Sequence, residues 1–355
     1  MLVGYGLWAI SGITHHDVPG NPDYYVVRQS AYVAVGIVGL VAALAIDPAW
    51  YSRRWRLIFG GTVFVIAIVF AQGAVRGSRR WLDLGFFRFQ PSEFGKVLFV
   101  LALAGFLAER TRKLGEARTV AQVVGLACVP IGLVFLQPDV GTAMVYTAAF
   151  AAILFVAGTR WLHLGALAGL AALVAITVLW VGPAGGVHIL QPYQVDRLTG
   201  FFHPNSDPGG ATYNIVQSKN AIGAGQWHGR GVDGATQTTL HFLPEHHTDF
   251  VFASLSEERG FVGASILLGL YLLVVWRGLR IVALARDAFS AIVAGGIVFG
   301  LLFQIFVNVG MTMGIAPITG IPAPFLSVGG SSMIANLAAV GILLAIHVRA
   351  RGARR

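Results

Sequence analysis

Long runs of hydrophobic residues, separated by short polar or Gly/Pro-rich segments, occupy most of the chain. Most runs are about 17 to 25 residues long, which is the length that an α-helix needs to cross a hydrocarbon core of about 30 Å. The strands of a membrane barrel would be shorter and would alternate hydrophobic with polar residues, so helices are the form that fits these runs. The pattern therefore predicts an all-α integral membrane protein.

These runs predict ten transmembrane helices. Their approximate ranges are 1–10, 29–46, 57–72, 94–109, 120–136, a sixth that follows Gly141 and ends near 157, then 161–181, 249–276, 289–313 and 331–347. The first run is too short to span a membrane, which predicts either a half-length helix or a true start upstream of this one. No internal repeat divides the chain, so a single polytopic membrane domain, 1–355, is predicted.

A polar, Gly-rich segment, 182–248, separates the seventh predicted helix from the eighth. It is far longer than an ordinary connection and is therefore predicted to be functional. Fifteen of the 25 Lys and Arg residues fall on the opposite side of the predicted helices. By the positive-inside rule that side is cytoplasmic, together with both termini, and 182–248 is a large extracytoplasmic loop.

Composition and charge narrow the function. Hydrophobic residues make up 56% of the chain and charged residues 12%. In soluble domains about a quarter of all residues are charged. The formal net charge of +9 does not indicate nucleic-acid binding, because the basic residues lie in short loops rather than on one face. No nucleic-acid partner is predicted.

Polar residues at the predicted outer face form four blocks. The first block, 77–96, alternates arginines such as Arg79 and Arg80 with aromatic residues, as a segment at the membrane interface does. Glu93 and Lys96 follow at the start of a helix, three residues apart and so on one face. Anchoring explains the aromatics, whereas a structural ion pair and a substrate contact both stay open for Glu93 and Lys96.

The second block carries a carboxylate at a helix break, and the third suits the binding of an anionic group. QPDVGT, 137–142, places Asp139 at a helix break, where the carboxylate is either a cap or part of a substrate site. In 182–248, four glycines lie close together, but no strand precedes them, which argues against a dinucleotide or P-loop site. A Gly-rich loop is predicted instead, offering backbone N–H groups and cations to an anion. Its glycines are at 223, 225, 229 and 231, and its cations are Arg197, Lys219 and Arg230.

The fourth block, FLPEHHTDF at 242–250, places Glu245, His246, His247 and Asp249 within five residues. A metal site made of His246, His247 and Asp249 is disfavoured, because adjacent histidines point in different directions and no third well-spaced ligand is apparent. A Ser/His/Asp hydrolase is also disfavoured, since no G-x-S-x-G motif is present. Asp249 is the candidate general base, and a helix-capping role is the alternative.

Together these blocks resemble the SEDS (shape, elongation, division and sporulation) family, and its RodA type in particular. The matching segments run in the family's order from about Gln29 to the final helix: WLDLGFFRFQPSEFGK, QPDVGTAMV, YQVDRLTGFFHPNSDPGGATYNIVQSKNAIGAGQWHGRG, GATQ, FLPEHHTDFVFASLSEERGFVGA and PITGIPAPFLSVGGSSM. PITGIP favours the RodA type over the division homologue FtsW. The chain departs from the usual pattern at Val328, where an aromatic is common, and at the inserted Ala235.

The resemblance implies a peptidoglycan glycosyltransferase of the bacterial cytoplasmic membrane with ten transmembrane helices. Lipid II would be its substrate, polymerised into glycan strands at the outer face for cell elongation and shape, and a class B penicillin-binding protein, a transpeptidase, would be its partner. The family's essential HTDF carboxylate falls on Asp249, and its QPSE carboxylate and the following lysine fall on Glu93 and Lys96.

The resulting hypothesis is that Asp249 accepts a proton from the acceptor sugar while cations neutralise the departing pyrophosphate. Lys96 is the first candidate for that cation and Arg197 the second. The predicted substrate-binding residues are Glu93, Lys96, Arg197, Lys219, Arg80 and Asp139. A divalent cation, Mg²⁺ or Mn²⁺, is a candidate cofactor. The alternatives are a lipid II flippase, an FtsW-type division enzyme, and a non-catalytic scaffold of a cell-wall synthase.

Overall fold

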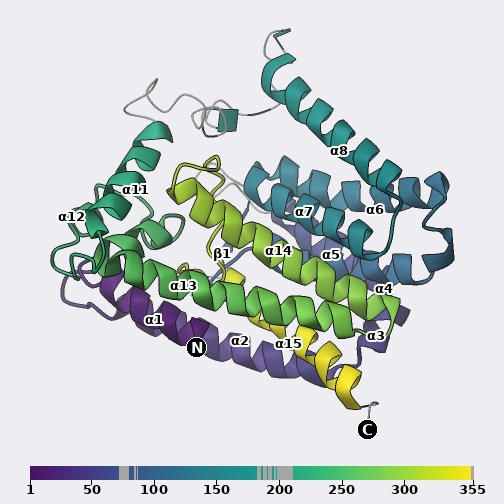
Figure 1. Cartoon of the computed structure of the whole chain (residues 1–355), viewed down its shortest axis with the longest axis horizontal. Helices are drawn as coiled ribbons and strands as arrows, with labels where there is room; N and C mark the ends of the chain where they lie inside the picture. Colours follow the sequence, from purple (N-terminus) through teal and green to yellow (C-terminus); the bar gives the residue numbers. More distant parts are fainter. Residues whose placement is uncertain are drawn as a thin grey trace. The chain divides into compact units, whose positions relative to one another are not determined.

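The computed structural model describes residues 1–71, 80–83, 85, 87–181, 185–186, 190, 194–195, 197 and 211–352. Helices dominate this part of the chain (Figure 1). They are α1 (Leu2–Ile13), α2 (Tyr24–Ala45), α3 (Pro48–Arg53), α4 (Trp55–Ala67), α5 (Pro91–Ala108), α6 (Ala117–Leu136), α7 (Val140–Val156), α8 (Trp161–Ile176), α11 (Ala211–Gly225), α12 (Thr236–Thr239), α13 (Val251–Leu284), α14 (Ala288–Thr312) and α15 (Gly330–Gly352).

Shorter elements complete the described chain. They are the 3-10 turns η1 (Ile68–Ala71) and η2 (Thr111–Lys113), the π-helical turn η3 (Thr177–Val181) that continues α8, and the strands β1 (Leu82–Asp83) and β2 (Arg88–Phe89). The two strands pair antiparallel, with Leu82 opposite Phe89. The predicted all-α class is confirmed, since this hairpin is the sheet that the described residues form.

The predicted membrane spans correspond to apolar helices of differing length. In the described part of the chain, seven helices are long and apolar enough to cross a membrane: α2, α5, α6, α8 with η3, α13, α14 and α15. Shorter apolar helices lie at Leu2–Ile13, Trp55–Ala71 and Val140–Val156, where three further spans were predicted. The chain is a multi-pass membrane protein, and the count of ten spans stays a prediction.

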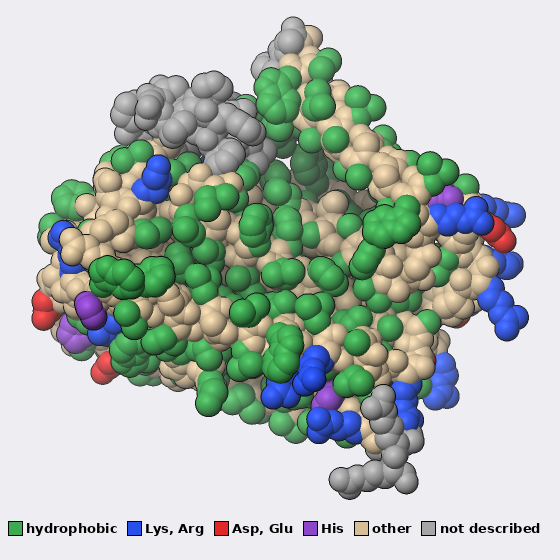
Figure 2. Space-filling view, in the orientation of Figure 1, with side chains coloured by type: hydrophobic (Ala, Val, Ile, Leu, Met, Phe, Trp, Pro, Cys, Tyr) green, Lys and Arg blue, Asp and Glu red, His purple; other side chains and the backbone are tan. Residues whose placement is uncertain are grey.

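The apolar helices differ in what surrounds them. In α5 and α14, 72% of the most apolar stretch is buried by protein, whereas none of that stretch in α8 is buried. Figure 2 shows hydrophobic side chains along α8, and Leu162 there is 80% exposed. A helix that is apolar all round and uncovered by protein suits lipid as its surroundings.

Two compact units make up the chain, and each is built from three segments. The first unit comprises 1–38, 193–276 and 301–337, and the second comprises 39–192, 277–300 and 338–355. In the first unit, the buried core includes Leu243, Phe250 and Met311. In the second, Phe99 and Tyr146 are fully buried with their ring centroids 5.0 Å apart.

Two sequence expectations are wrong in detail. The segment 182–248 is not a plain loop, since it contains α11 and α12. Buried positions recur at 212, 215, 218 and 221 of α11, a helical spacing that its polar composition hides. In addition, α13 extends to Leu284, so Arg277 and Arg280 lie on this helix rather than in a cytoplasmic loop.

Candidate functional site

The segment that carries Asp249 forms a tight turn before α13. Glu245 has a φ of +51°, and its carbonyl accepts hydrogen bonds from the N–H groups of Thr248 (3.1 Å) and Phe250 (3.2 Å). The hydroxyl of Thr248 donates to the Glu245 carboxylate at 2.9 Å. Phe250 is buried in the core of the first unit, so packing anchors the end of this turn.

Three successive carbonyls of this turn are bound by the chain between 308 and 328. The N–H of Val328 donates to the carbonyl of His247 at 3.0 Å, and the hydroxyl of Ser327 donates to that of Thr248 at 2.6 Å. The amide of Asn308 donates to the carbonyl of Asp249 at 2.9 Å and to that of Ile321 at 2.8 Å. These bonds fix the backbone of Asp249 and so orient its side chain.

The carboxylate of Asp249 lies beside Gly320 and Arg197. A β-carbon on Gly320 would lie 3.4 Å from Oδ2 of Asp249 and 3.7 Å from Nη1 of Arg197, so the acid and the guanidinium converge on one side of this glycine. Gly320 has a φ of +69°, a conformation that residues with a side chain rarely adopt. Asp249 itself is only half-buried, as a base that meets a substrate must be.

Lys219 belongs to the same unit as Asp249. It is exposed on α11, and its Cδ lies 3.3 Å from the position of a β-carbon on Gly314. Ser218, the preceding residue, is buried and donates from its hydroxyl to the carbonyl of Thr312 at 2.7 Å. This bond holds α11 against the end of α14 and leaves the ammonium group of Lys219 on the surface.

The remaining predicted site residues lie in the second unit and form two groups. Nζ of Lys96 donates to Oε2 of Glu93 at 2.9 Å, with both side chains largely buried at the start of α5. Of the two options that the sequence left open, the ion pair is therefore present. A buried pair is strongly destabilised when one partner is removed, since the other charge is then buried alone.

Asp139 is the N-cap of α7 and also belongs to a polar cluster. Its carboxylate accepts from the N–H of Thr142 at 3.2 Å and from Nε2 of Gln90 at 3.2 Å. Arg80 places Nη1 3.9 Å from the same carboxylate and donates from Nε to the carbonyl of Gln137 at 3.2 Å. The capping interpretation is thus confirmed, with Arg80 as an added partner, whereas Arg79 lies outside the described residues.

The glycines of the third block do not form the predicted anion-binding loop. Gly223 and Gly225 lie inside α11, and a β-carbon on Gly225 would overlap the carbonyl oxygen of Ser256 on α13. Gly229 meets the backbone of Glu258 in the same way. Gly225 and Gly229 permit close backbone packing. Arg230 is likewise used structurally, because its Nε donates to the carbonyl of Ala224 at 3.1 Å.

That close packing coincides with a break in α13. Gly260 has a φ of +64°, and the chain at 226–231 is hydrogen-bonded to both sides of the break. The N–H groups of 230 and 231 donate to the carbonyls of 257 and 258, while the N–H groups of 261 and 262 donate to the carbonyls of 226 and 227. Backbone groups freed by the kink are satisfied by this segment.

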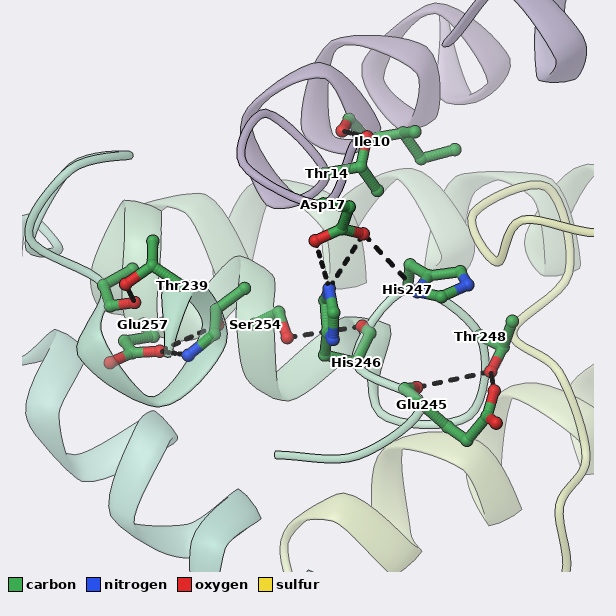
Figure 3. A network of polar contacts seen from close by, with 12 residues as sticks. Ile10, Thr14, Asp17, Thr239, Glu245, His246, His247, Thr248, Ser254 and Glu257 are labelled. Atoms are coloured by element: carbon green, nitrogen blue, oxygen red, sulfur yellow. Dashed lines mark hydrogen bonds and ion pairs between the residues drawn. The ribbon is translucent and has the colours of Figure 1, made fainter. Parts of the chain in front are cut away.

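The two histidines before Asp249 share a partner that the sequence does not reveal. Nε2 of His246 lies 3.0 Å from Oδ1 of Asp17, and Nδ1 of His247 lies 3.7 Å from Oδ2 (Figure 3). The objection that adjacent histidines diverge does not hold, because one uses Nε2 and the other Nδ1. Burial of the ring, and secondarily the neighbouring His246, lower the pKa of His247, which favours the neutral imidazole.

Comparison with known proteins identifies the family. The sequence model of the FtsW/RodA/SpoVE family, whose description is "Cell cycle protein", matches residues 2–352. The chain belongs to the FtsW/RodA/SpoVE family. Among its relatives, the peptidoglycan glycosyltransferase MrdB of Escherichia coli (strain K12) is 38% identical over 348 residues, covering 98% of this chain and 92% of MrdB.

Solved structures of the FtsW/RodA/SpoVE fold resemble the chain over nearly its whole length. A structure described as "Structural coordination of polymerization and crosslinking by a peptidoglycan synthase complex" matches with a TM-score of 0.81 at 29% identity, covering 99% of this chain and 97% of that one. Thermus thermophilus RodA matches with a TM-score of 0.71 at 27% identity, covering 99% and 94%. The predicted resemblance to the SEDS family and its RodA type is confirmed.

Proposed function

We propose that this FtsW/RodA/SpoVE protein is a RodA-type peptidoglycan glycosyltransferase in which Asp249 is the general base. The observation that carries the assignment is the half-buried carboxylate of Asp249, on a backbone fixed by Asn308, with Arg197 beside it. The family membership and the activity in the name of MrdB support the reaction class. Lipid II is the proposed substrate, and glycan strands for elongation and shape are the proposed product.

The proposed reaction joins two lipid-linked disaccharides. Asp249 takes the proton from the 4-hydroxyl of the acceptor's N-acetylglucosamine, and that oxygen forms a bond to the anomeric carbon of the donor. The bond from this carbon to the undecaprenyl pyrophosphate oxygen breaks, and the leaving group retains the electron pair. Attack opposite the leaving group inverts the anomeric centre.

Positive charge near the departing pyrophosphate would stabilise the transition state. In this proposal Arg197 and Lys219, which belong to the same unit as Asp249, supply that charge. Lys96, held by Glu93, and Arg80, held by Asp139, are proposed as further substrate contacts. A divalent ion, Mg²⁺ or Mn²⁺, would supply the same neutralisation, with carboxylate oxygens as its preferred protein donors.

The proposed location is the bacterial cytoplasmic membrane, with lipid II met at the outer face. Basic residues in the last turn of α15 (Arg349 and Arg351) and around the junction of α3 with α4 (Arg53, Arg54 and Arg56) support cytoplasmic termini. A class B penicillin-binding protein is the proposed partner, because one solved relative belongs to a complex that coordinates polymerization with crosslinking.

The decisive experiment is polymerisation of lipid II by purified protein in detergent, where no transbilayer movement can occur. Asp249→Asn removes the proton acceptor while keeping the size of the side chain, and we expect at least a 100-fold loss of rate. Asp233→Asn is the matched control, since Asp233 is exposed and pairs only with a surface histidine among the described residues. Wild-type polymerisation by Asp249→Asn would refute the assignment of the base.

A further inference from the structure

Three metal-ligating side chains converge just before the turn that carries Asp249. Asp17 comes from the segment between α1 and α2, and His246 and His247 come from the segment before α13 (Figure 3). Their nearest ligand atoms all lie within 4.8 Å of one another. Bonds of about 2.0 to 2.2 Å to one zinc ion place ligand atoms roughly 3 to 3.5 Å apart, so small side-chain shifts suffice.

Without an ion, the polar atoms of this cluster are incompletely paired. The side chains of Asp17 and His246 are 7% and 6% exposed, and Nδ1 of His247 is buried with no hydrogen-bond partner. If Nδ1 carries a proton, it lies too far from Asp17, at 3.7 Å, to donate well. If Nδ1 carries a lone pair, it faces an oxygen that is also an acceptor.

A cation would satisfy the arrangement in which Nδ1 carries the lone pair, because the carboxylate and the lone pair can bind it together. In the described part of the chain, ion pairs join Asp17 to these imidazoles and not to lysine or arginine. The cluster therefore has the charge and the donor atoms of a metal site.

We propose that Asp17, His246 and His247 bind a divalent transition-metal ion of the zinc class. Two imidazole nitrogens and one carboxylate oxygen suit Zn²⁺ and its neighbours in the first transition row, whereas Mg²⁺ and Ca²⁺ prefer oxygen donors. The ion ties the segment between α1 and α2 to the turn before α13. It is a site separate from the base, since Asp249 is not one of the three ligands.

The test is direct metal binding to the full-length chain in detergent, purified with a tag that contains no histidine and stripped with chelator. Calorimetric titration with Zn²⁺ should give one bound ion per chain. Asp17→Asn and His247→Gln should each weaken binding at least tenfold. His16→Gln is the matched control, because His16 precedes Asp17 but pairs with the exposed Asp233. Mg²⁺ at the same concentration should not displace Zn²⁺.

Two further measurements separate this proposal from folding defects and from the proposed activity. Wild-type protein loaded with one equivalent of Co²⁺ should show the visible absorption of a nitrogen- and oxygen-ligated ion, which requires no variant. Asp249→Asn should lose polymerisation and retain Zn²⁺ binding. Absence of stoichiometric Zn²⁺ binding, or equal affinity in wild type and folded Asp17→Asn, would overturn the metal site.

Discussion

Asn308 offers a sharp test of how the fold positions Asp249. Its side chain is fully buried, and its amide nitrogen donates to the carbonyls of Asp249 and Ile321 at 2.9 and 2.8 Å. Asn308→Ala leaves the buried carbonyl of Ile321 and the partly buried carbonyl of Asp249 without this donor. An unsatisfied buried group costs about 1–3 kcal/mol, and solvent reduces the cost for Asp249, so we expect a loss of about 1–4 kcal/mol in the free energy of unfolding.

Asn308→Asp should be at least as damaging, although it keeps the shape of the side chain. It replaces the amide donor by a carboxylate oxygen that faces two carbonyl oxygens, and an ionised carboxylate there would be buried without a partner. One of the two carbonyls that lose their donor belongs to Asp249 itself. We therefore expect the turnover of lipid II to fall at least tenfold, even at temperatures where the variant remains folded.

The matched control is Asn336→Ala. Asn336 is also buried, but its amide donates to the hydroxyl of Ser332 at 3.2 Å, one turn earlier on α15. Its loss should cost about 1 kcal/mol and leave turnover unchanged. Thermal unfolding in detergent and the rate of lipid II polymerisation measure the two effects. A destabilised Asn308→Ala protein with wild-type turnover would refute the positioning role of Asn308.

Two further predictions use contacts of other glycines and charges. Gly225→Ala should lower the unfolding temperature, because the added β-carbon would overlap the backbone of Ser256. Gly223→Ala is the control: a β-carbon there would have nothing within 4 Å, so this variant should be neutral or stabilised by about 0.5–1 kcal/mol. Equal unfolding temperatures for the two variants would contradict the packing of α11 on α13. Lys96→Met should destabilise the fold by about 3–5 kcal/mol, because the Glu93 carboxylate would then be buried without a partner. Adding Glu93→Gln to this variant should recover much of the lost stability. Thermal unfolding of the single and double variants measures both effects.

The sequence alone predicted the membrane helices well. Spanning a bilayer requires a long apolar run, and that requirement is local, so α5, α6, α8 and α14 begin and end within a few residues of the expected positions. Asp249 also stood out from sequence, because ionisable residues beside a bilayer are costly. Its surroundings could not be predicted in the same way.

The tertiary structure decided which distant residues meet. Asp17 lies 229 residues from His246, and only the fold brings the carboxylate to the imidazole. The sequence around Asn308 contains no motif that distinguishes it from any other polar residue in a helix. Its side-chain amide nevertheless donates a hydrogen bond to the backbone carbonyl of Asp249. The sequence predicts that Gly225 belongs to an anion-binding loop, whereas its close approach to Ser256 shows that it serves packing. The type of a side chain limits the chemistry that it can perform. Long-range packing decides which neighbours it has, and so which of those roles it takes.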